Sequence, residues 1–222
     1  MEVLLLGKKR DDPFFQRVLD YSRTSIPGLR VFLAEAGQTL PEEVHAWQGD
    51  YLISYLCPWV IPAAVLNQAR VAAINFHPAP PEYPGTGCTN FAIYDGVSTY
   101  GVTCHHMAEI VDSGSIIAVR RFDVTPQDSV YSLTQRCYAY LMVLYYDIVS
   151  QILRGEPLPR SAEVWSRRAY RRKELNALKR IELGMPLDEI RRRVKASAYP
   201  GTPGAYIEID GMRFEYKPDD PL

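Results

Sequence analysis

Three polar side chains near the middle of the chain have the types that acyl transfer to an amine requires. Asn75 and His77 lie in the run Asn75-Phe76-His77-Pro78, and Asp112 follows 35 residues later in Asp112-Ser113-Gly114. Such a transfer needs a hydrogen-bond donor for the oxygen that becomes negative when the amine attacks, and a group that handles the amine's proton. The Asn75 amide can donate, and His77 can donate or take a proton because histidine ordinarily titrates near neutral pH. Asp112 can orient His77 or hold a water molecule that relays the proton.

The position of these side chains follows from the strand that carries them. Residues 71–76 form a short, mostly apolar run, and side chains two residues apart on a strand point to the same face, so Asn75 and His77 should project together. The prolines after His77 cannot donate to a sheet, so the strand should end there. In open α/β sheets, ligands bind at the carboxyl ends of the strands. We therefore expect both side chains at a ligand-binding edge.

The elements around this strand alternate between short apolar runs and helix-like segments, which is typical of a parallel sheet covered by helices. Strands are expected at 2–6, 29–33, 51–55 and 71–77, with helices from 13 to about 23, at 41–47 and at 62–68. After a Pro- and Gly-rich loop at 78–87, a short helix at 89–94 precedes a strand that ends near 107 and another at 116–124. The sequence thus predicts an α/β fold with a central, mostly parallel sheet.

A long helix should begin after Asp128 or Ser129, either of which can cap it, and should end before Gly155 and Pro157. Its apolar residues recur at spacings of three and four, which predicts a stripe packed in the core rather than a cofactor site. The stripe consists of Val130, Leu133, Cys137, Leu141, Leu144, Ile148 and Ile152.

The composition of the 222 residues, 47% hydrophobic and 23% charged with a net charge of −1, is that of a globular protein. There is no run of 18 apolar residues and the N-terminus does not resemble a signal peptide, so a cytoplasmic location and no membrane partner are expected. The four cysteines form no Cys-x-x-Cys pair, and a mixed zinc site with Cys88, Cys104, His105 and His106 is disfavoured because adjacent histidines face opposite sides of a strand. No metal is expected.

Three segments together resemble the 10-formyltetrahydrofolate-dependent formyltransferases, and most of all the sugar-nucleotide N-formyltransferases. They are residues 74–85 (INFHPAPPEYPG), 101–105 (GVTCH) and 111–114 (VDSG). The resemblance implies a Rossmann-like formyltransferase domain, with 10-formyltetrahydrofolate as the one-carbon donor. It also implies that Asn75, His77 and Asp112 are the catalytic residues, and it places His105 behind them as a supporting residue.

The resemblance also indicates where the folate should lie. The expected cofactor-binding residues form two backbone segments: Pro58, Trp59, Val60 and Ile61, and then Ala108, Glu109, Ile110 and Val111 leading to Asp112. Backbone N–H and C=O groups flanked by apolar side chains can match the donors and acceptors of a flat pteridine ring. Trp59 could stack on the cofactor or fill the wall of the site.

The acceptor suggested by the resemblance is the amino group of a nucleotide-linked sugar, such as a dTDP- or GDP-linked 4-amino-4,6-dideoxy sugar used for surface polysaccharide. The chain after the catalytic domain, expected at 1–158, is a small extension at 159–222 with a helix at 186–196 and a hairpin around Asp210-Gly211, as in those enzymes. The expected substrate-binding residues are Lys8, Arg10, Pro80, Glu82, Tyr83 and Gly87.

The basic part of the extension leaves alternatives open. Residues 160–195 contain 12 Lys or Arg against 5 Asp or Glu, which suits a pyrophosphate but is also common on a solvated helix face. Other acceptors within the same chemistry are a carrier-bound amino acid, a hydroxylamine or glycinamide ribonucleotide, and a non-catalytic nucleotide-sugar or folate binder is a further alternative. Nucleic acid is not expected as a partner, because the segment lacks interleaved aromatic residues and only 67 residues follow Gly155. A homodimer could form through the hairpin and the Tyr-rich helix.

Overall fold

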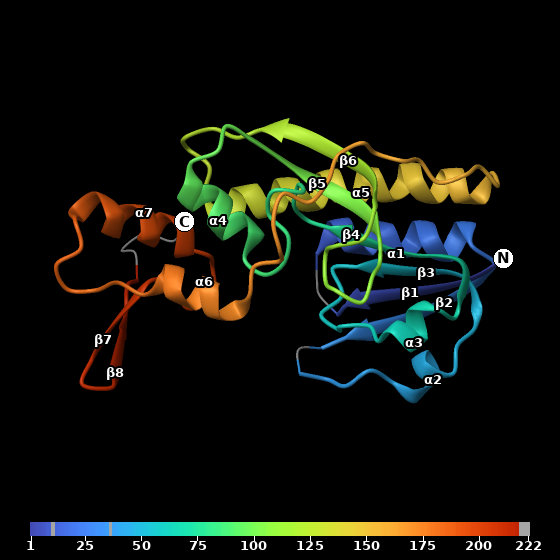
Figure 1. The fold of residues 1–222 in the computed structure, drawn as a ribbon, viewed down its shortest axis with the longest axis horizontal. Helices are drawn as coiled ribbons and strands as arrows, with labels where there is room; N and C mark the ends of the chain where they lie inside the picture. The colour runs from blue at the N-terminus through green and yellow to red at the C-terminus, as the bar shows by residue number, and fades with distance from the viewer. Residues whose placement is uncertain (10–11, 36, 218–222) are drawn as a thin grey trace.

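The computed structural model describes residues 1–9, 12–35 and 37–217. Its centre is a sheet of six strands (Figure 1). The strand order is β2-β1-β3-β4-β5-β6, with β1 to β4 parallel and β5 and β6 antiparallel to their neighbours. The strands are β1 (Glu2–Lys8), β2 (Gly28–Ala34), β3 (Gly49–Tyr55), β4 (Ala69–His77), β5 (Thr99–His106) and β6 (Ile116–Asp123). The predicted α/β fold with a mostly parallel sheet is confirmed.

Helices cover both faces of the sheet, as the alternation of buried residues on β1 requires (Figure 1). Val3 and Leu5 belong to the core on the side of α1 (Pro13–Ser25) and α5 (Val130–Leu153). Leu4 and Leu6 belong to a second, smaller core on the side of α2 (Glu42–His45) and α3 (Ala63–Leu66). A strand buried on both faces is a central strand, and this one is flanked by β2 and β3.

The order of the strands creates a ligand-binding crevice. From β1 the chain passes to β2 on one side, and it then returns to form β3 on the other side of β1. The connections that follow β1 and β3 therefore run in opposite directions, and side chains at the carboxyl ends of such strands can surround a ligand. β4, which lies beside β3, ends at His77 in the same row of strand ends.

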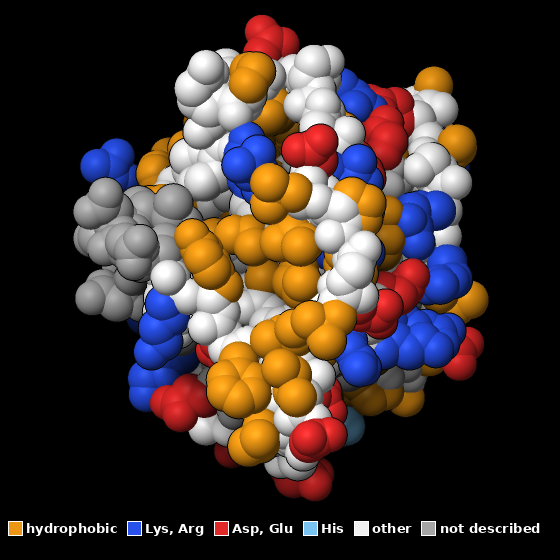
Figure 2. Space-filling view, turned by 90° about the vertical axis from the view of Figure 1, so that its left-hand side faces the viewer, with side chains coloured by type: hydrophobic (Ala, Val, Ile, Leu, Met, Phe, Trp, Pro, Cys, Tyr) orange, Lys and Arg blue, Asp and Glu red, His pale blue; other side chains and the backbone are white. Residues whose placement is uncertain are grey.

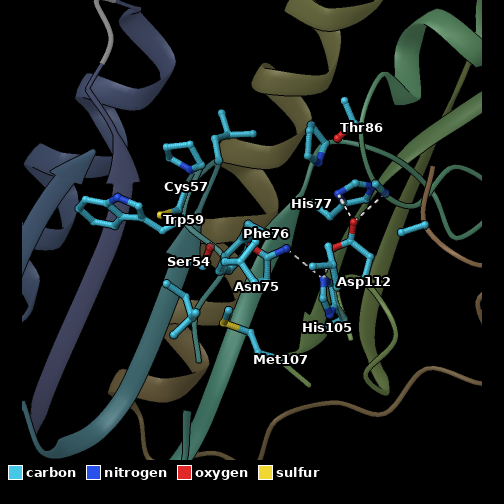
Figure 3. Close-up of a pocket in the computed structure, with 18 of the residues that line it drawn as sticks. Ser54, Cys57, Trp59, Asn75, Phe76, His77, Thr86, His105, Met107 and Asp112 are labelled. Carbon is cyan, nitrogen blue, oxygen red and sulfur yellow. Dashed lines mark hydrogen bonds and ion pairs between the residues drawn. The ribbon is translucent and has the colours of Figure 1, made fainter. Parts of the chain in front are cut away.

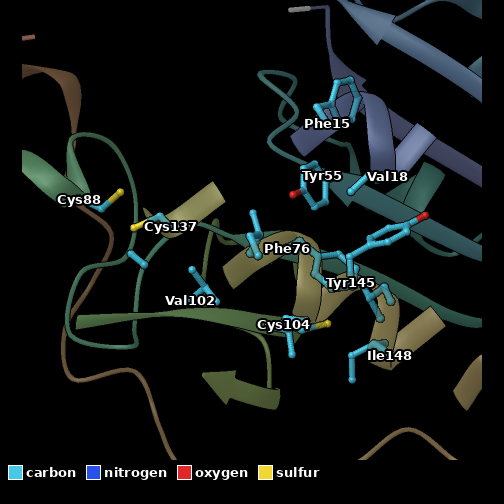
Figure 4. Close-up of a cluster of buried hydrophobic side chains, with 14 of the residues drawn as sticks. Phe15, Val18, Tyr55, Phe76, Cys88, Val102, Cys104, Cys137, Tyr145 and Ile148 are labelled. Atoms are coloured by element: carbon cyan, nitrogen blue, oxygen red, sulfur yellow. The ribbon is translucent and has the colours of Figure 1, made fainter. Parts of the chain in front are cut away.

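The long helix α5 packs its apolar stripe against the sheet, and Figure 4 shows part of this core. Of the two expected caps, Ser129 is the one used. Its Oγ accepts from the Ser132 N–H at 3.1 Å, while Ser132 Oγ accepts from the Ser129 N–H at 2.9 Å. All seven predicted stripe residues are buried, which confirms the stripe as core packing.

The C-terminal part adds α6 (Arg172–Lys179), α7 (Leu187–Ser197), which packs against α4 (Cys88–Asp95), and a hairpin of β7 (Tyr206–Ile209) and β8 (Met212–Glu215). Leu175 and Leu178 of α6 join the main core. The division of the chain at residue 158 stays a prediction. No helix in the described ranges is long and apolar enough to cross a bilayer.

Hydrophobic side chains gather on the end of the molecule that carries this extension (Figure 2). On the hairpin, Ile207 pairs with Phe214 and Ile209 with Met212, so these four side chains share one face. Three of them are exposed, and Ile207 is partly exposed. A homodimer formed through this surface stays a prediction.

The packing of α5 gives a direct test of the core. Leu141→Ala should lower the free energy of unfolding by about 2–5 kcal/mol, because the fully buried side chain would leave a cavity. Val143→Ala, two residues further on the same helix and 40% exposed, should cost less than about 1 kcal/mol. Urea unfolding of both variants measures the difference, and equal costs would show that the stripe is not the packed face.

Candidate functional site

A pocket of about 810 Å³ opens at the carboxyl ends of β1, β3 and β4, where the strand order predicts a ligand site (Figure 3). Its wall contains all three residues singled out for acyl transfer, Asn75, His77 and Asp112. Asn75 and His77 lie two residues apart on β4, while the intervening Phe76 packs on the rings of Tyr55 and Tyr145. The strand alternation therefore brings the two polar side chains to the pocket and anchors the strand behind them.

Asp112 is the point where the polar groups of the site meet. Its Oδ2 accepts from the backbone N–H of Gly85 at 2.7 Å and lies 3.4 Å from Nδ1 of His77. Its Oδ1 lies 3.3 Å from Nε2 of His105. Asp112 and both histidines are buried, so these contacts replace water around the carboxylate.

The backbone around Asp112 explains the Asp-x-Gly spacing. Asp112 has a φ of 48°, a left-handed conformation that aspartate tolerates better than most residues. Two residues later, a Cβ on Gly114 would overlap the carbonyl oxygen of His106 at the end of β5. Only glycine lets the turn pass this close to β5, and that approach brings Asp112 to His105.

The charge of Asp112 follows from these neighbours. Burial alone would raise the pKa of its carboxyl group, but the adjacent imidazoles of His77 and His105 and the Gly85 N–H favour the ionised form more strongly. The pKa of Asp112 therefore lies well below its ordinary value of 3.8. The site contains a permanent buried anion at neutral pH.

The hydrogen bonds of His77 define what each ring nitrogen can do. Nε2 lies 3.0 Å from the carbonyl oxygen of Tyr83, which can only accept, so Nε2 carries a hydrogen. Nδ1 faces the Asp112 carboxylate. A proton taken up at Nδ1 would be held against this anion, so His77 is suited to receive a proton during a reaction.

His105 lies in the pocket wall itself, closer to the site than a supporting residue behind it. It pairs with Asn75 in the register of β4 and β5, and its Nε2 is 3.0 Å from the Asn75 amide nitrogen. Its Nδ1 donates to the backbone carbonyl of His106 at 2.8 Å. These contacts fix the ring, and the ring in turn orients Asn75 and faces Asp112.

The two segments expected to bind a folate both line the pocket. Val60 is 71% exposed and Ile110 is 70% exposed, which is unusual for apolar side chains in a concave site. Within the described ranges, the backbone groups of Val60 and of 108–111 have no hydrogen-bond partner, apart from the Ile110 carbonyl, which accepts from Ser113 Oγ. Trp59 donates its indole N–H to the Gln38 carbonyl and packs on the smaller core, which favours the wall-filling alternative.

The C-terminal extension also contributes to the site, which sequence reasoning did not foresee in detail. The ring of Trp165 meets the rings of His105 and His77 edge to face, at centroid distances of 5.0 and 6.0 Å, and its N–H donates to the Gly114 carbonyl. Tyr170 pairs with the loop that holds Asp112, since its N–H donates to the Pro84 carbonyl and its carbonyl accepts from the Thr86 N–H. The one local signal in the sequence for the contact of the extension with His77 and His105 was Trp165, a tryptophan in a basic segment.

The structure places the expected substrate-binding residues in different environments. Lys8 lines the pocket, and Arg10 lies outside the described residues.

Four of the expected substrate-binding residues are not part of the pocket lining: Pro80, Glu82, Tyr83 and Gly87. Glu82 pairs with Arg121, and the Tyr83 hydroxyl donates to Asp95 at 2.8 Å. Pro80 is buried, and Gly87 precedes α4 against Leu175. A contact of these four residues with substrate stays a prediction.

A family model described as "Formyl transferase" matches residues 30–145, slightly more than half of the chain. The chain belongs to the formyl transferase family. The matched part runs from β2 into α5 and includes Asn75, His77, His105 and Asp112. The family resemblance expected from the sequence is thus confirmed, and so is the fold that it implied.

Individual relatives of the chain include an enzyme named for a nucleotide sugar. GDP-perosamine N-formyltransferase of Brucella melitensis is 29% identical over 163 residues, which cover 73% of this chain and 62% of that protein. The chain thus spans under two thirds of that curated relative. Among solved structures, a likely sugar N-formyltransferase from Mycobacterium tuberculosis superposes with a TM-score of 0.77, 22% identity and 99% coverage of both chains. An N-formyltransferase from Helicobacter canadensis, in complex with folinic acid and dTDP-3-aminofucose, superposes with a TM-score of 0.72 and 16% identity. The superposition covers 95% of this chain and 85% of that one.

The buried anion predicts a dependence of stability on pH. Because the pKa of Asp112 is lower in the folded protein than in the unfolded chain, its ionised form stabilises the fold above about pH 4, and this contribution is lost as the pH falls toward the folded pKa. The Asp112→Asn variant lacks this contribution. The difference in unfolding free energy between the wild type and Asp112→Asn should therefore shrink as the pH falls from 5 to 3, as measured by urea unfolding. A difference that grows in this range would contradict the assignment.

Proposed function

We propose that this formyl transferase moves a formyl group from 10-formyltetrahydrofolate to the amino group of a nucleotide-linked amino sugar. The convergence of Asn75, His77 and Asp112 in one pocket carries this proposal. It combines an amide donor, an imidazole whose Nδ1 faces a carboxylate, and a fixed anion, which are the groups that formyl transfer to an amine needs.

The pocket fits a folate on two counts. Exposed apolar side chains at Val60 and Ile110 offer a surface for a flat ring, and unpaired backbone groups beside them offer hydrogen bonds to its edge. Pro58–Ile61 and Ala108–Val111 would hold the cofactor there. When bound, the cofactor supplies the formyl carbon.

The residues of the chain have distinct roles in the proposed reaction. Asn75, oriented by His105, donates its amide hydrogen to the formyl oxygen as negative charge develops there. His77 would take the proton of the attacking amine at Nδ1 and return it to the departing nitrogen of the donor, as the bond between that nitrogen and the formyl carbon breaks and tetrahydrofolate leaves. Asp112 stays ionised, since its pKa is so low, and it therefore orients His77 and stabilises the protonated ring rather than carrying the proton itself.

Relatives support the choice of acceptor. The Brucella enzyme is named for a nucleotide sugar, GDP-perosamine, and the Helicobacter N-formyltransferase was solved in complex with another, dTDP-3-aminofucose. The Mycobacterium structure, a likely sugar N-formyltransferase, aligns along 99% of both chains, so the extension with α6, α7 and the hairpin has a counterpart there.

An activity assay tests the proposal. The full chain should transfer the formyl group from 10-formyltetrahydrofolate to at least one member of a panel of dTDP-, GDP- and UDP-linked amino sugars, with mass spectrometry of the product as the readout. Glycinamide ribonucleotide in the same panel is the control for the acceptor. Formylation of glycinamide ribonucleotide alone would overturn the acceptor and leave the chemistry in place.

His77→Ala should reduce kcat by at least about 100-fold, because it removes the group that receives the proton. The affinity for the nucleotide sugar should change little, since the ring contacts the reacting amine rather than the nucleotide. His106→Ala is the matched control: His106 is the last residue of β5, is half-buried and is not part of the pocket lining. A His77→Ala variant with near wild-type kcat would contradict the role of the imidazole.

A further inference from the structure

Four cationic side chains line the pocket, and three of them have no anionic partner in the described part of the chain. Arg168 is neutralised by Glu174, which accepts from both of its terminal nitrogens, at 2.9 and 3.1 Å. Lys8, Arg171 and Arg172 are exposed and form no ion pair there.

The acidic side chains of the pocket do not offset this charge. The lining contains two acidic side chains, Asp112 and Glu109, and the Asp112 oxygens face His77 and His105. Glu109 is thus the one carboxylate of the lining left to oppose Lys8, Arg171 and Arg172. The pocket therefore has an excess of positive charge that a ligand can match.

The two arginines are presented by a rigid part of the extension. The preceding residue, Tyr170, forms two backbone hydrogen bonds with the 84–86 loop, at 2.8 and 2.9 Å. Its ring stacks on Phe91 with a centroid distance of 3.8 Å, and the Arg167 guanidinium lies 3.3 Å from its centroid. Gly85 has a φ of 89°, and a Cβ there would overlap the Tyr170 carbonyl oxygen, so the two segments are in close contact.

The same loop connects these arginines to the reaction centre. Gly85 donates its N–H to Asp112, while its neighbours Pro84 and Thr86 hold Tyr170. Arg171 therefore follows directly after a residue whose position is fixed relative to the catalytic carboxylate. A charged group bound by Arg171 and Arg172 would lie in the same pocket as His77.

We propose that Arg171 and Arg172, assisted by Lys8, bind the diphosphate of the acceptor. This inference rests on the proposed function, which it deepens by assigning the residues that retain the nucleotide. Guanidinium groups present pairs of N–H donors that match phosphate oxygens, and a diphosphate supplies two or more negative charges for these cations. The anchored diphosphate would leave the neutral amine of the sugar free to face His77.

Binding measurements with the full chain test this proposal without a turnover assay. Isothermal titration calorimetry would compare dTDP, GDP, thymidine and 5-formyltetrahydrofolate with the wild type and with the double variant Arg171→Gln/Arg172→Gln. Lys173→Gln is the matched control, because Lys173 is the next cation on the same helix, is exposed and is not part of the pocket lining. Circular dichroism and thermal unfolding check that the exposed substitutions leave the fold intact.

The double variant should bind dTDP and GDP at least about tenfold more weakly than the wild type, because two charge-assisted contacts are lost. Its affinity for 5-formyltetrahydrofolate should stay within about twofold, and Lys173→Gln should resemble the wild type. The preference of the wild type for dTDP over thymidine should diminish in the double variant.

Several results would overturn the assignment. One is equal affinity of the wild type and the double variant for dTDP and GDP, and another is an equal loss of that affinity in Lys173→Gln. A wild type that binds neither diphosphate would also overturn it. A loss of affinity confined to 5-formyltetrahydrofolate would assign the arginines to the anionic tail of the folate. Failure of the proposed function is distinguishable: a protein that formylates no amino sugar but loses dTDP binding in the double variant retains the diphosphate site. A protein that formylates a nucleotide sugar while the double variant binds dTDP normally retains the function alone.

Discussion

The buried carboxylate of Asp112 is the interaction on which the rest of the site depends. Taking an anion out of water is costly unless hydrogen bonds and opposite charge compensate for the lost hydration. Here the compensation comes from three separate parts of the chain: His77 at the end of β4, His105 on β5, and the Gly85 N–H in the loop after β4. Satisfying one charge therefore fixes the relative positions of these segments, and the same charge then acts on the reacting groups. Stability and chemistry share a single set of contacts.

The loop at 84–86 extends this arrangement to the C-terminal extension. It contacts Asp112 on one side and Tyr170 on the other, so the basic segment is placed relative to the buried anion through one short piece of backbone. Trp165, which packs on both histidines and bonds to Gly114, forms a second link between the same regions. The extension is therefore part of the pocket as well as an addition to the fold. The basic segment therefore lies in the wall of the same pocket as Asn75 and His77 at the end of β4.

The parts of this picture that the sequence could predict are those with local signals. Short apolar runs predicted the strands, the prolines after His77 predicted where β4 ends, and the spacing of three and four on α5 predicted the core stripe. Each of these signals depends on near neighbours in the chain. The close contact of His105 with Asn75 depends on the register between β4 and β5, and that of Tyr170 on pairing across 85 residues, so neither had a local signal. Glu82 pairs with Arg121 and Tyr83 with Asp95, and no motif indicated either partner.

Asp112 acts on the chemical step in the proposed reaction by orienting His77 and stabilising the ring once it has taken the proton. Single-turnover kinetics of the Asp112→Asn variant, with donor and acceptor bound before the reaction starts, measures this step separately from binding. We expect a rate constant for formyl transfer at least about 100-fold below that of the wild type, with the dissociation constants of both substrates within a few-fold of their wild-type values. A chemical step close to the wild-type rate, or a loss explained entirely by weaker binding, would contradict it.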